Sequence, residues 1–285
     1  MKVHLYNYFF KNNNIVLKRF FIKLYPSLGM ANVEDSVVST VYYKNSHFLF
    51  LCDISSNIDR VIISGSLHST YIIETARKFL KSNSIVVDVG ANIGSVSIPL
   101  AKLSPDCEIY SFEPSELLFS QLTKNVSLNH ILNCKLFNIG LSSESGVVKF
   151  YDMGCVSGNR GTSSISRNID NLQAVENEIA VDTIDSQFAD IDRSISLIKI
   201  DVQGHELQVL NGGFNTICKN RPVIIFEHED DYFDDSSTVK DDIALFFDRI
   251  NYDLYFLNPV NHNLYYPVDL SGYFNGNILA LPNES

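Results

Sequence analysis

Charged side chains interrupt an apolar run at residues 198–206, IKIDVQGHE. Lys199 and Asp201 stand where a buried β-strand would end, just before a turn at Gly204. Charge at the carboxyl end of a buried strand is costly unless a partner or a ligand uses it. Because a carboxylate at such a place can bind or deprotonate a hydroxyl group, we predict that Asp201 is catalytic and that Lys199 sets its charge state.

A structural interpretation of the same residues stays open. Lys199 and Asp201 could form an ion pair, or Asp201 could cap the following helix. His205 is a candidate general base because histidine titrates near neutral pH, but it could also be merely packed. Glu206 is a candidate site residue that could instead favour the helix N-terminus.

A second strand end carries charge at residues 222–229, PVIIFEHE. In a parallel sheet this end lies at the same edge as Asp201, so we predict that Glu227 and His228 line the pocket of the molecule that reacts. The alternative is that both residues begin a solvated acidic loop over residues 227–235.

A glycine-containing turn follows an apolar run at residues 86–94, VVDVGANIG. Its two glycines let the backbone turn sharply and approach a ligand. This sequence differs from the motif G-x-G-x-x-G, which forms the loop that binds a pyrophosphate at the start of a helix. An acidic residue before the turn suits a cationic ligand, and S-adenosylmethionine carries a sulfonium and an ammonium group. We therefore predict cofactor contacts from Asp88, Gly90, Ala91, Asn92 and Gly94.

A carboxylate also ends the next predicted strand, in YSFEP, where Glu113 stands 25 residues after Asp88. A carboxylate at this position can accept hydrogen bonds from both ribose hydroxyls of a nucleoside. The structural alternative is a tight turn with a helix capped by Glu113. Residues 138–142, at the next strand end, are predicted to flank the adenine. The further predicted cofactor contacts are Glu113, Pro114, Gly140 and Leu141.

The elements that must position these residues alternate between strands and helices from about residue 68 onwards. Apolar runs bounded by turns predict buried parallel strands, and apolar residues at helical spacing between them predict helices on both faces of one sheet. The chain is thus predicted to have an α/β fold. The strands are expected at residues 84–91, 108–114, 134–142, 195–202 and 222–229, with a final strand pair at 252–259 and 277–282.

About 50 residues separate the third and fourth strands, which is long for a crossover. We predict an insertion over residues 143–194 that contains a β-hairpin, and a loop whose Ser163 and Ser164 either contact the site or are only flexible. The expected domain division is a basic arm and extension at 1–67 and a main domain at 68–285.

The formal net charge of −11 argues against a nucleic-acid partner, because phosphate-binding surfaces need clustered lysine and arginine. Residues 1–30 are basic and aromatic, and lack the long apolar run of a membrane span. We expect a helical arm that packs on the domain. The alternative is peripheral contact with an anionic membrane.

The five cysteines are spread along the chain without a CxxC pair, which argues against a zinc site or a disulfide framework and fits a reducing cytoplasm. We predict no metal ion, because no compact trio of Asp, Glu or His has ligand spacing. The sequence indicates no oligomeric state.

Residues 68–230 resemble the FkbM-type family of S-adenosylmethionine-dependent methyltransferases. The resemblance lies in VVDVGANIG, FEP, NIGLS, VDTID, IKIDVQGHELQVLNGG and RPVIIFEHE, in this order. It implies a class I methyltransferase-like Rossmann sheet of seven strands with the last antiparallel. It also implies O-methylation of a sugar, a glycan intermediate or a related small molecule, often in polysaccharide biosynthesis.

The chain departs from this family at Gln203, where the family usually has Glu. A glutamine keeps its hydrogen-bonding groups but takes no proton at neutral pH. If that carboxylate were the base, the chain would be a non-catalytic cofactor-binding protein. A nicotinamide-dependent sugar oxidoreductase or epimerase is a less favoured alternative, because it would need G-x-G-x-x-G and a Tyr-x-x-x-Lys pair.

Overall fold

The chain folds around a central sheet that runs through the parts described by the computed structural model, which are residues 36–53, 56–67, 69–152, 165, 175–230, 236–259, 265–268, 270 and 274–283. The arm predicted at residues 1–30 and the loop serines Ser163 and Ser164 lie outside the described residues. The sheet order is β12 (Tyr265–Pro267), β11 (Tyr252–Leu257), β13 (Asn275–Pro282), β10 (Val223–Glu229), β9 (Ile195–Ile200), β3 (Ile85–Val89), β4 (Glu108–Phe112) and β5 (Cys134–Phe137).

Strand directions in this sheet confirm the predicted α/β fold. The five strands from β10 to β5 are parallel, and β13 lies antiparallel between β10 and β11. The described sheet has eight strands rather than seven, because the short strand β12 pairs with the free edge of β11. Sequence patterns did not reveal β12, since three residues are too few for a periodicity.

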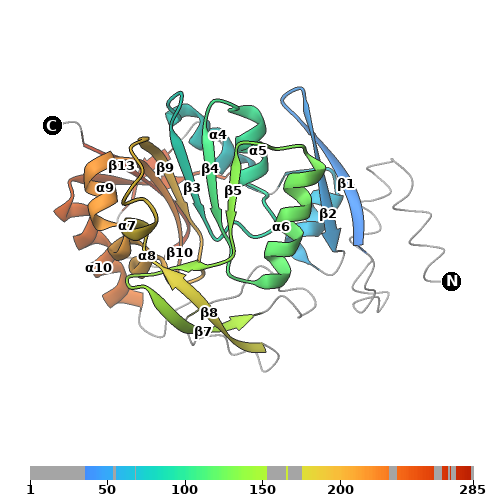
Figure 1. Cartoon of the computed structure of the whole chain (residues 1–285). Coiled ribbons are helices and arrows are strands. Elements are labelled where there is room, and N and C mark those ends of the chain that lie inside the picture. Colours follow the sequence, from blue (N-terminus) through green and yellow to red (C-terminus); the bar gives the residue numbers. More distant parts are fainter. Residues whose placement is uncertain are drawn as a thin grey trace.

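The parallel strands are apolar on both faces because helices cover both sides of the sheet (Figure 1). Alternation along a strand sends Val86 of β3 into one hydrophobic core and Val87 into the other. The first core includes side chains of α4 (Thr70–Phe79), α5 (Ser97–Leu103) and α6 (Glu116–Leu128). The second includes side chains of α7 (Ile184–Gln187), α8 (Glu206–Gly212), α9 (Phe214–Asn220) and α10 (Ser236–Arg249).

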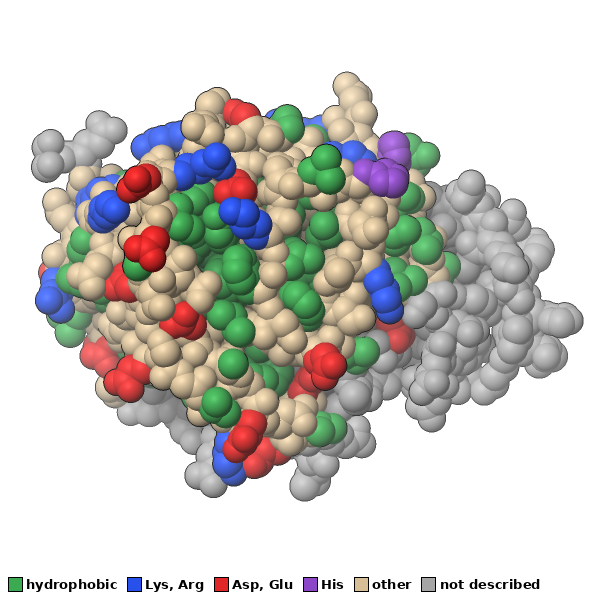
Figure 2. Space-filling view, viewed as in Figure 1, with side chains coloured by type: hydrophobic (Ala, Val, Ile, Leu, Met, Phe, Trp, Pro, Cys, Tyr) green, Lys and Arg blue, Asp and Glu red, His purple; other side chains and the backbone are tan. Residues whose placement is uncertain are grey.

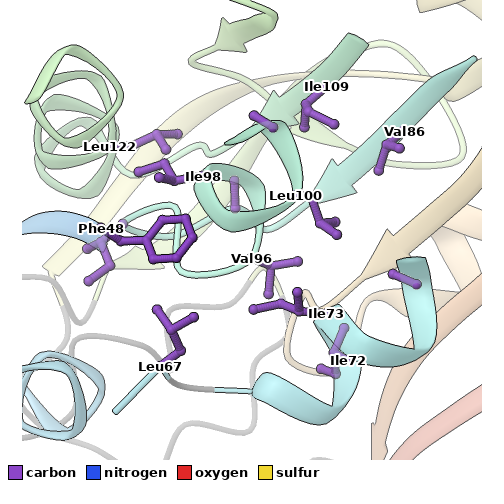
Figure 3. Packing of buried hydrophobic residues seen from close by; sticks show 14 of the residues in the cluster. Phe48, Leu67, Ile72, Ile73, Val86, Val96, Ile98, Leu100, Ile109 and Leu122 are labelled. Carbon is purple, nitrogen blue, oxygen red and sulfur yellow. The ribbon is translucent and has the colours of Figure 1, made fainter. Parts of the chain in front are cut away.

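An N-terminal hairpin joins the first core. It consists of β1 (Ser36–Tyr43) and β2 (Ser46–Asp53), and α3 (Asn57–Ile63) follows it. Figure 3 shows Phe48 of β2 beside Leu122 of α6 and Ile98 of α5. Residues 36–67 belong to the predicted extension, and their described part packs into the same core as the main domain.

Side-chain amides of α6 bind the outer edge of β2. Asn125 and Asn129 accept hydrogen bonds from the backbone N–H groups of Leu51 and Leu49, at 2.6 and 2.9 Å. Gln121 donates to the Leu51 carbonyl at 2.7 Å. These amides repeat every four residues and therefore lie on one face of the helix. They satisfy backbone groups that an edge strand would otherwise leave unpaired.

Two strands of the predicted insertion, β7 (Gly146–Asp152) and β8 (Val175–Asp182), form a separate three-stranded sheet with β6 (Gly140–Leu141), which precedes the insertion. Strands β7 and β8 are the antiparallel hairpin expected from the sequence. The third predicted strand, 134–142, divides into β5 and β6. It breaks at Asn138, whose side chain donates to the Glu113 carbonyl at 2.9 Å and to the Pro114 carbonyl at 3.1 Å.

Charges on the face in Figure 2 are mixed: over the described residues, acidic and basic side chains are interspersed and form no continuous basic area. Exposed pairs such as Lys149–Glu176 on the β7–β8 hairpin follow the same pattern. Within the described ranges, no helix has the length and hydropathy that crossing a membrane requires.

Candidate active site

The glycine loop after β3 touches the loop after β9. Gly90 has φ +74°, and a Cβ atom built there would lie 1.9 Å from the Asp201 carbonyl oxygen. Only glycine allows this contact, so Gly90 brings the two strand ends together. Gly94 has φ +89°, and a Cβ atom there would lie 2.8 Å from side-chain atoms of Ile98 and Leu122. A backbone contact therefore requires glycine at position 90, whereas the positive φ favours glycine at position 94.

Glu113 braces the glycine loop from the end of β4. Its carboxylate accepts hydrogen bonds from the backbone N–H groups of Asn92, at 2.8 Å, and Ser115, at 2.9 Å. The side chain is buried, and burial raises the pKa of Glu113 to about 7. Glu113 thus holds the turn, as the structural alternative predicts, but the N-cap of α6 is Ser115 rather than Glu113. Because a carboxylate has about four acceptor positions, these two bonds leave capacity for ligand hydroxyls.

Lys199 links the glycine loop to both neighbouring acids. Its Nζ lies 3.1 Å from an oxygen of Asp88 and 3.5 Å from one of Asp201, and it donates to the Gly90 carbonyl at 2.8 Å. Burial lowers the pKa of Lys199, but the charges of Asp88 and Asp201 outweigh this effect and raise it above its ordinary value. Lys199 therefore stays charged and fixes the geometry of the strand ends.

The position of Asp88 corrects a prediction. From the sequence, its carboxylate was expected to face a cationic ligand. In the structure Asp88 has no exposed surface, and it contacts Lys199 and the Ser97 hydroxyl, which donates to it at 2.5 Å. Strand alternation turns this side chain into the protein, so it acts on the loop through Lys199.

Asp201 and Glu227 meet at the carboxyl ends of β9 and β10, as the sequence predicts for parallel neighbours. The amide of Gln203 donates to Asp201 at 2.9 Å and to Glu227 at 2.7 Å. Burial, together with the charge and a hydrogen bond of Asp201, raises the pKa of Glu227 far above its ordinary value. Since two close carboxylates do not both ionise readily, the pair retains a proton near neutral pH.

Two residues that sequence reasoning missed stand beside this pair. Asn277 of β13 lies opposite Glu227 in the strand register, and its amide donates to the Tyr71 hydroxyl at 2.8 Å. Burial, followed by the charges of Glu227 and Asp201, raises the pKa of Tyr71 to about 12. A polar residue at the start of the apolar strand 277–282 was a usable signal for Asn277. A tyrosine in the first turn of α4 gave none.

Glu206 and His205 hold the loop after β9 rather than joining the acidic pair. The Glu206 carboxylate accepts the backbone N–H groups of Val202, at 3.2 Å, and Gly204, at 3.1 Å. Its side chain is buried, and burial raises its pKa to about 7. The His205 ring is 2.9 Å from the Ser142 hydroxyl, and burial lowers its pKa to about 4. A histidine with so low a pKa is a poor general base at pH 7.

His228 also departs from its predicted place. It follows Glu227 on β10 and therefore points to the other face of the sheet. It is 1% exposed, and its Nε2 lies 2.9 Å from Asp230. Asp230 in turn accepts from Lys240 and from the Phe274 backbone N–H, both at 2.9 Å. His228 thus belongs to a buried charged cluster and not to the site that holds Asp201.

The residues predicted beside the adenine lie next to the end of β4. Gly140 and Leu141 are buried in β6, and a Cβ atom on Gly140 would be 3.8 Å from Pro114. Ala91 is also buried, whereas Asn92 is partly exposed and has φ +53°. Among the described side chains, no three or more of His, Cys, Asp and Glu are arranged so that they could hold a metal ion.

Comparison with known proteins places this geometry in a family. The family model described as "Methyltransferase FkbM domain" matches residues 88–254, which is more than half of the chain. Methyltransferase sdnD of Sordaria araneosa is 30% identical over 159 residues, covering 47% of this chain and 61% of that protein.

The names of two further relatives state a substrate in one case and a methylated oxygen in the other. Hexuronic acid methyltransferase AglP of Haloferax volcanii is 28% identical, covering 52% of this chain and 57% of that protein. The 2-O-methyltransferase NoeI of Sinorhizobium fredii is 26% identical, covering 50% of this chain and 62% of that protein. In each case the match spans about three fifths of the relative's length.

Proposed function

The chain belongs to the FkbM methyltransferase family, and on this basis we propose that it transfers the methyl group of S-adenosylmethionine to a hydroxyl group of a sugar, a glycan intermediate or a related small molecule. One observation carries the proposal. The glycine loop braced by Glu113 and the acidic pair of Asp201 and Glu227 lie at the carboxyl ends of neighbouring parallel strands. In open α/β sheets this edge is where ligands bind.

The cofactor side of the proposal rests on the loop from Gly90 to Gly94 and on Glu113. S-adenosylmethionine supplies an electrophilic methyl group when bound. The Glu113 carboxylate keeps acceptor capacity for ribose hydroxyls, and the loop turns at the start of the segment that leads to α5. The acidic character of this sheet edge favours a ligand with positive charge.

The proposal for the methyl acceptor depends on Asp201. Its side chain is 35% exposed, and Glu227 beside it retains a proton. Asp201 takes the hydroxyl proton as the acceptor oxygen forms its bond to the methyl carbon and the carbon–sulfur electron pair stays on sulfur. The substitution of Gln203 for the usual acid leaves these two carboxyl groups in place. Orientation and the removal of one proton are what this transfer requires.

The name of one relative, a hexuronic acid methyltransferase, supports a sugar acceptor, and the name of another, a 2-O-methyltransferase, supports transfer to oxygen. We therefore propose a role in polysaccharide or glycan biosynthesis, in the cytoplasm. Peripheral membrane contact through residues 1–30 is the alternative for the basic arm. Liposome sedimentation of the full chain against a form lacking residues 1–30 tests that contact, and equal sedimentation would exclude it.

Calorimetry and a transfer assay test the proposed function. We expect S-adenosylmethionine to bind and NAD not to bind. With a panel of hydroxylated sugars, we expect Asp201→Asn to lower methyl transfer by about 10²- to 10⁴-fold while cofactor affinity changes only a few-fold. The matched control is Asp190→Asn, at an exposed position, which should keep full activity.

Two outcomes would overturn the proposal. Binding of NAD without S-adenosylmethionine would indicate an oxidoreductase or epimerase. Tight binding of S-adenosylmethionine with no transfer to any hydroxylated acceptor would indicate a non-catalytic cofactor-binding protein. Full activity of Asp201→Asn would remove Asp201 from the chemistry without changing the family assignment.

A further inference from the structure

Gln203 connects the two carboxyl groups of the acceptor site. Its Nε2 atom donates to Oδ1 of Asp201 at 2.9 Å and to Oε2 of Glu227 at 2.7 Å. A primary amide has two N–H groups, so each carboxyl group can receive one.

The backbone at Gln203 is held in an uncommon conformation to make this contact. Gln203 has φ +55°, in the left-handed region that residues with a Cβ atom seldom occupy. The N–H groups on either side of it, those of Val202 and Gly204, are both bound by the buried carboxylate of Glu206. The loop therefore fixes the direction of one side chain, and such strain at a site is a sign of function.

The charges around the pair explain why a neutral donor is useful there. Lys199 lies closer to Asp88, at 3.1 Å, than to Asp201, at 3.5 Å, and it also binds the Gly90 carbonyl. Glu229 of β10 and Glu206 of α8 add negative charge near Glu227, and Tyr71 of α4 faces the same pair. The site therefore holds more carboxyl groups than cations among the described residues. A donor without charge can order the two acids and still leave a proton shared between them.

We propose that Gln203 is a positioning residue, whose amide holds the carboxyl groups of Asp201 and Glu227 together as a pair that carries one proton and one negative charge. This inference rests on the proposed function, in which the charged member receives the proton of the acceptor hydroxyl. The pair then carries two protons and releases one to water before the next turnover. The amide itself gives up no proton.

The replacement Gln203→Met tests the role of the amide, because methionine has a similar length but no hydrogen-bond donor. The matched control is Gln208→Met on α8, at a partly exposed position. Carboxyl groups are followed by ¹³C NMR between pH 4 and 10 in protein labelled at Asp and Glu, and the signal of Glu227 is assigned with Glu227→Gln. This titration needs no acceptor.

In Gln203→Met we expect the lower apparent pKa of the pair to rise by about one unit, because a donor to the ionised carboxylate has been lost. In Gln203→Glu we expect a third carboxyl group to hold one more proton at neutral pH. Gln208→Met should titrate like the parent protein. If methyl transfer is detectable, the acid limb of its pH profile should move upwards with the titration in Gln203→Met.

Failure of this inference differs from failure of the proposed function. An unchanged titration in a folded Gln203→Met protein would overturn the positioning role, whether or not methyl transfer is observed. A shifted titration without methyl transfer to any acceptor would keep the role and overturn the proposed function. If Gln203→Met does not fold, Gln203→Glu, which has the same shape as glutamine, decides by its proton uptake.

Discussion

Two acidic clusters include consecutive residues of β10, Glu227 in one and His228 in the other. The pKa of the central carboxyl group is raised in the first cluster and lowered in the second. On one face, Asp230 is 2.9 Å from both Lys240 and His228. Burial raises the pKa of Asp230, but these donors and the Phe274 N–H outweigh it, so the pKa lies below its ordinary value. On the other face, Glu227 meets Asp201 and the neutral amide of Gln203, and its pKa lies far above its ordinary value.

The contrast separates a structural cluster from a chemical one. The Asp230 cluster is buried and contains its own counter-charge, Lys240, so its carboxylate is already neutralised within the protein. The pair of Asp201 and Glu227 keeps a proton and a partly exposed carboxylate. Perturbed acids that outnumber the cations beside them are characteristic of sites where protons move. Two acids three residues apart, one within β10 and one just beyond its end, can therefore have unrelated roles.

The largest effect on stability is expected from Lys240→Met, which removes the cation of the structural cluster. The side chains of Lys240 and Asp230 are 7% and 5% exposed, so the substitution leaves a buried carboxylate without its cationic partner. We expect a loss of about 3 to 5 kcal/mol in the free energy of unfolding at pH 7. Denaturation in urea measures it. A loss below about 1 kcal/mol would mean that the ion pair of Lys240 and Asp230 does not stabilise the fold.

Glu227→Gln, in the cluster of Asp201 and Glu227, is expected to increase the free energy of unfolding at high pH, whereas Lys240→Met decreases it. Because the folded state raises the pKa of Glu227, its contribution to stability is present at low pH and is lost as the pH rises above the unfolded value. Glutamine does not ionise. The variant should therefore be more stable than the parent at pH 8, by about 2 kcal/mol, and similar at pH 4.5. Destabilisation at pH 8 would place Glu227 among the structural acids.

A smaller effect is expected from Glu206→Gln. This variant tests whether Glu206, which binds backbone N–H groups of its loop, makes stability depend on pH as Glu227 does. The folded state raises the pKa of Glu206 from 4.5 to about 7, so the parent loses stability as the pH rises through that window. The Oε1 atom accepts both backbone N–H groups, and glutamine keeps such an oxygen. We expect unfolding experiments to show a weaker pH dependence of stability between pH 4.5 and 7 in the variant than in the parent. An unchanged dependence would show that Glu206 does not titrate there.

The smallest effect is expected at an exposed ion pair outside both clusters. Lys149 and Glu176 are 2.6 Å apart, but their side chains are 67% and 50% exposed. Lys149→Met should change the free energy of unfolding by less than about 0.5 kcal/mol, because water screens the pair. The same urea titration serves as the control for Lys240→Met. A loss comparable to that of Lys240→Met would show that burial is not what distinguishes the two lysines.

The sequence alone determined the parallel sheet, its covering helices, the inserted hairpin and the strand ends that carry the site. These features follow from local patterns, since apolar runs and helical spacing are set by which faces must be buried. The pattern also predicted that Asp201 and Glu227 share one edge, because the carboxyl ends of parallel strands meet there. Alternation along β10 was also readable, and it would have separated His228 from Glu227.

Only the tertiary structure decided how each acid is used. Glu113 and Glu206 accept hydrogen bonds from backbone N–H groups, and Asp88 forms an ion pair with Lys199. Tyr71 reaches the site because α4 packs against the sheet, where the Tyr71 hydroxyl accepts a hydrogen bond from Asn277. The described residues 36–67 contribute side chains to the first core. These contacts depend on the register and docking of segments far apart in the chain. A one-dimensional pattern records which side chains are acidic, but not which donors surround them.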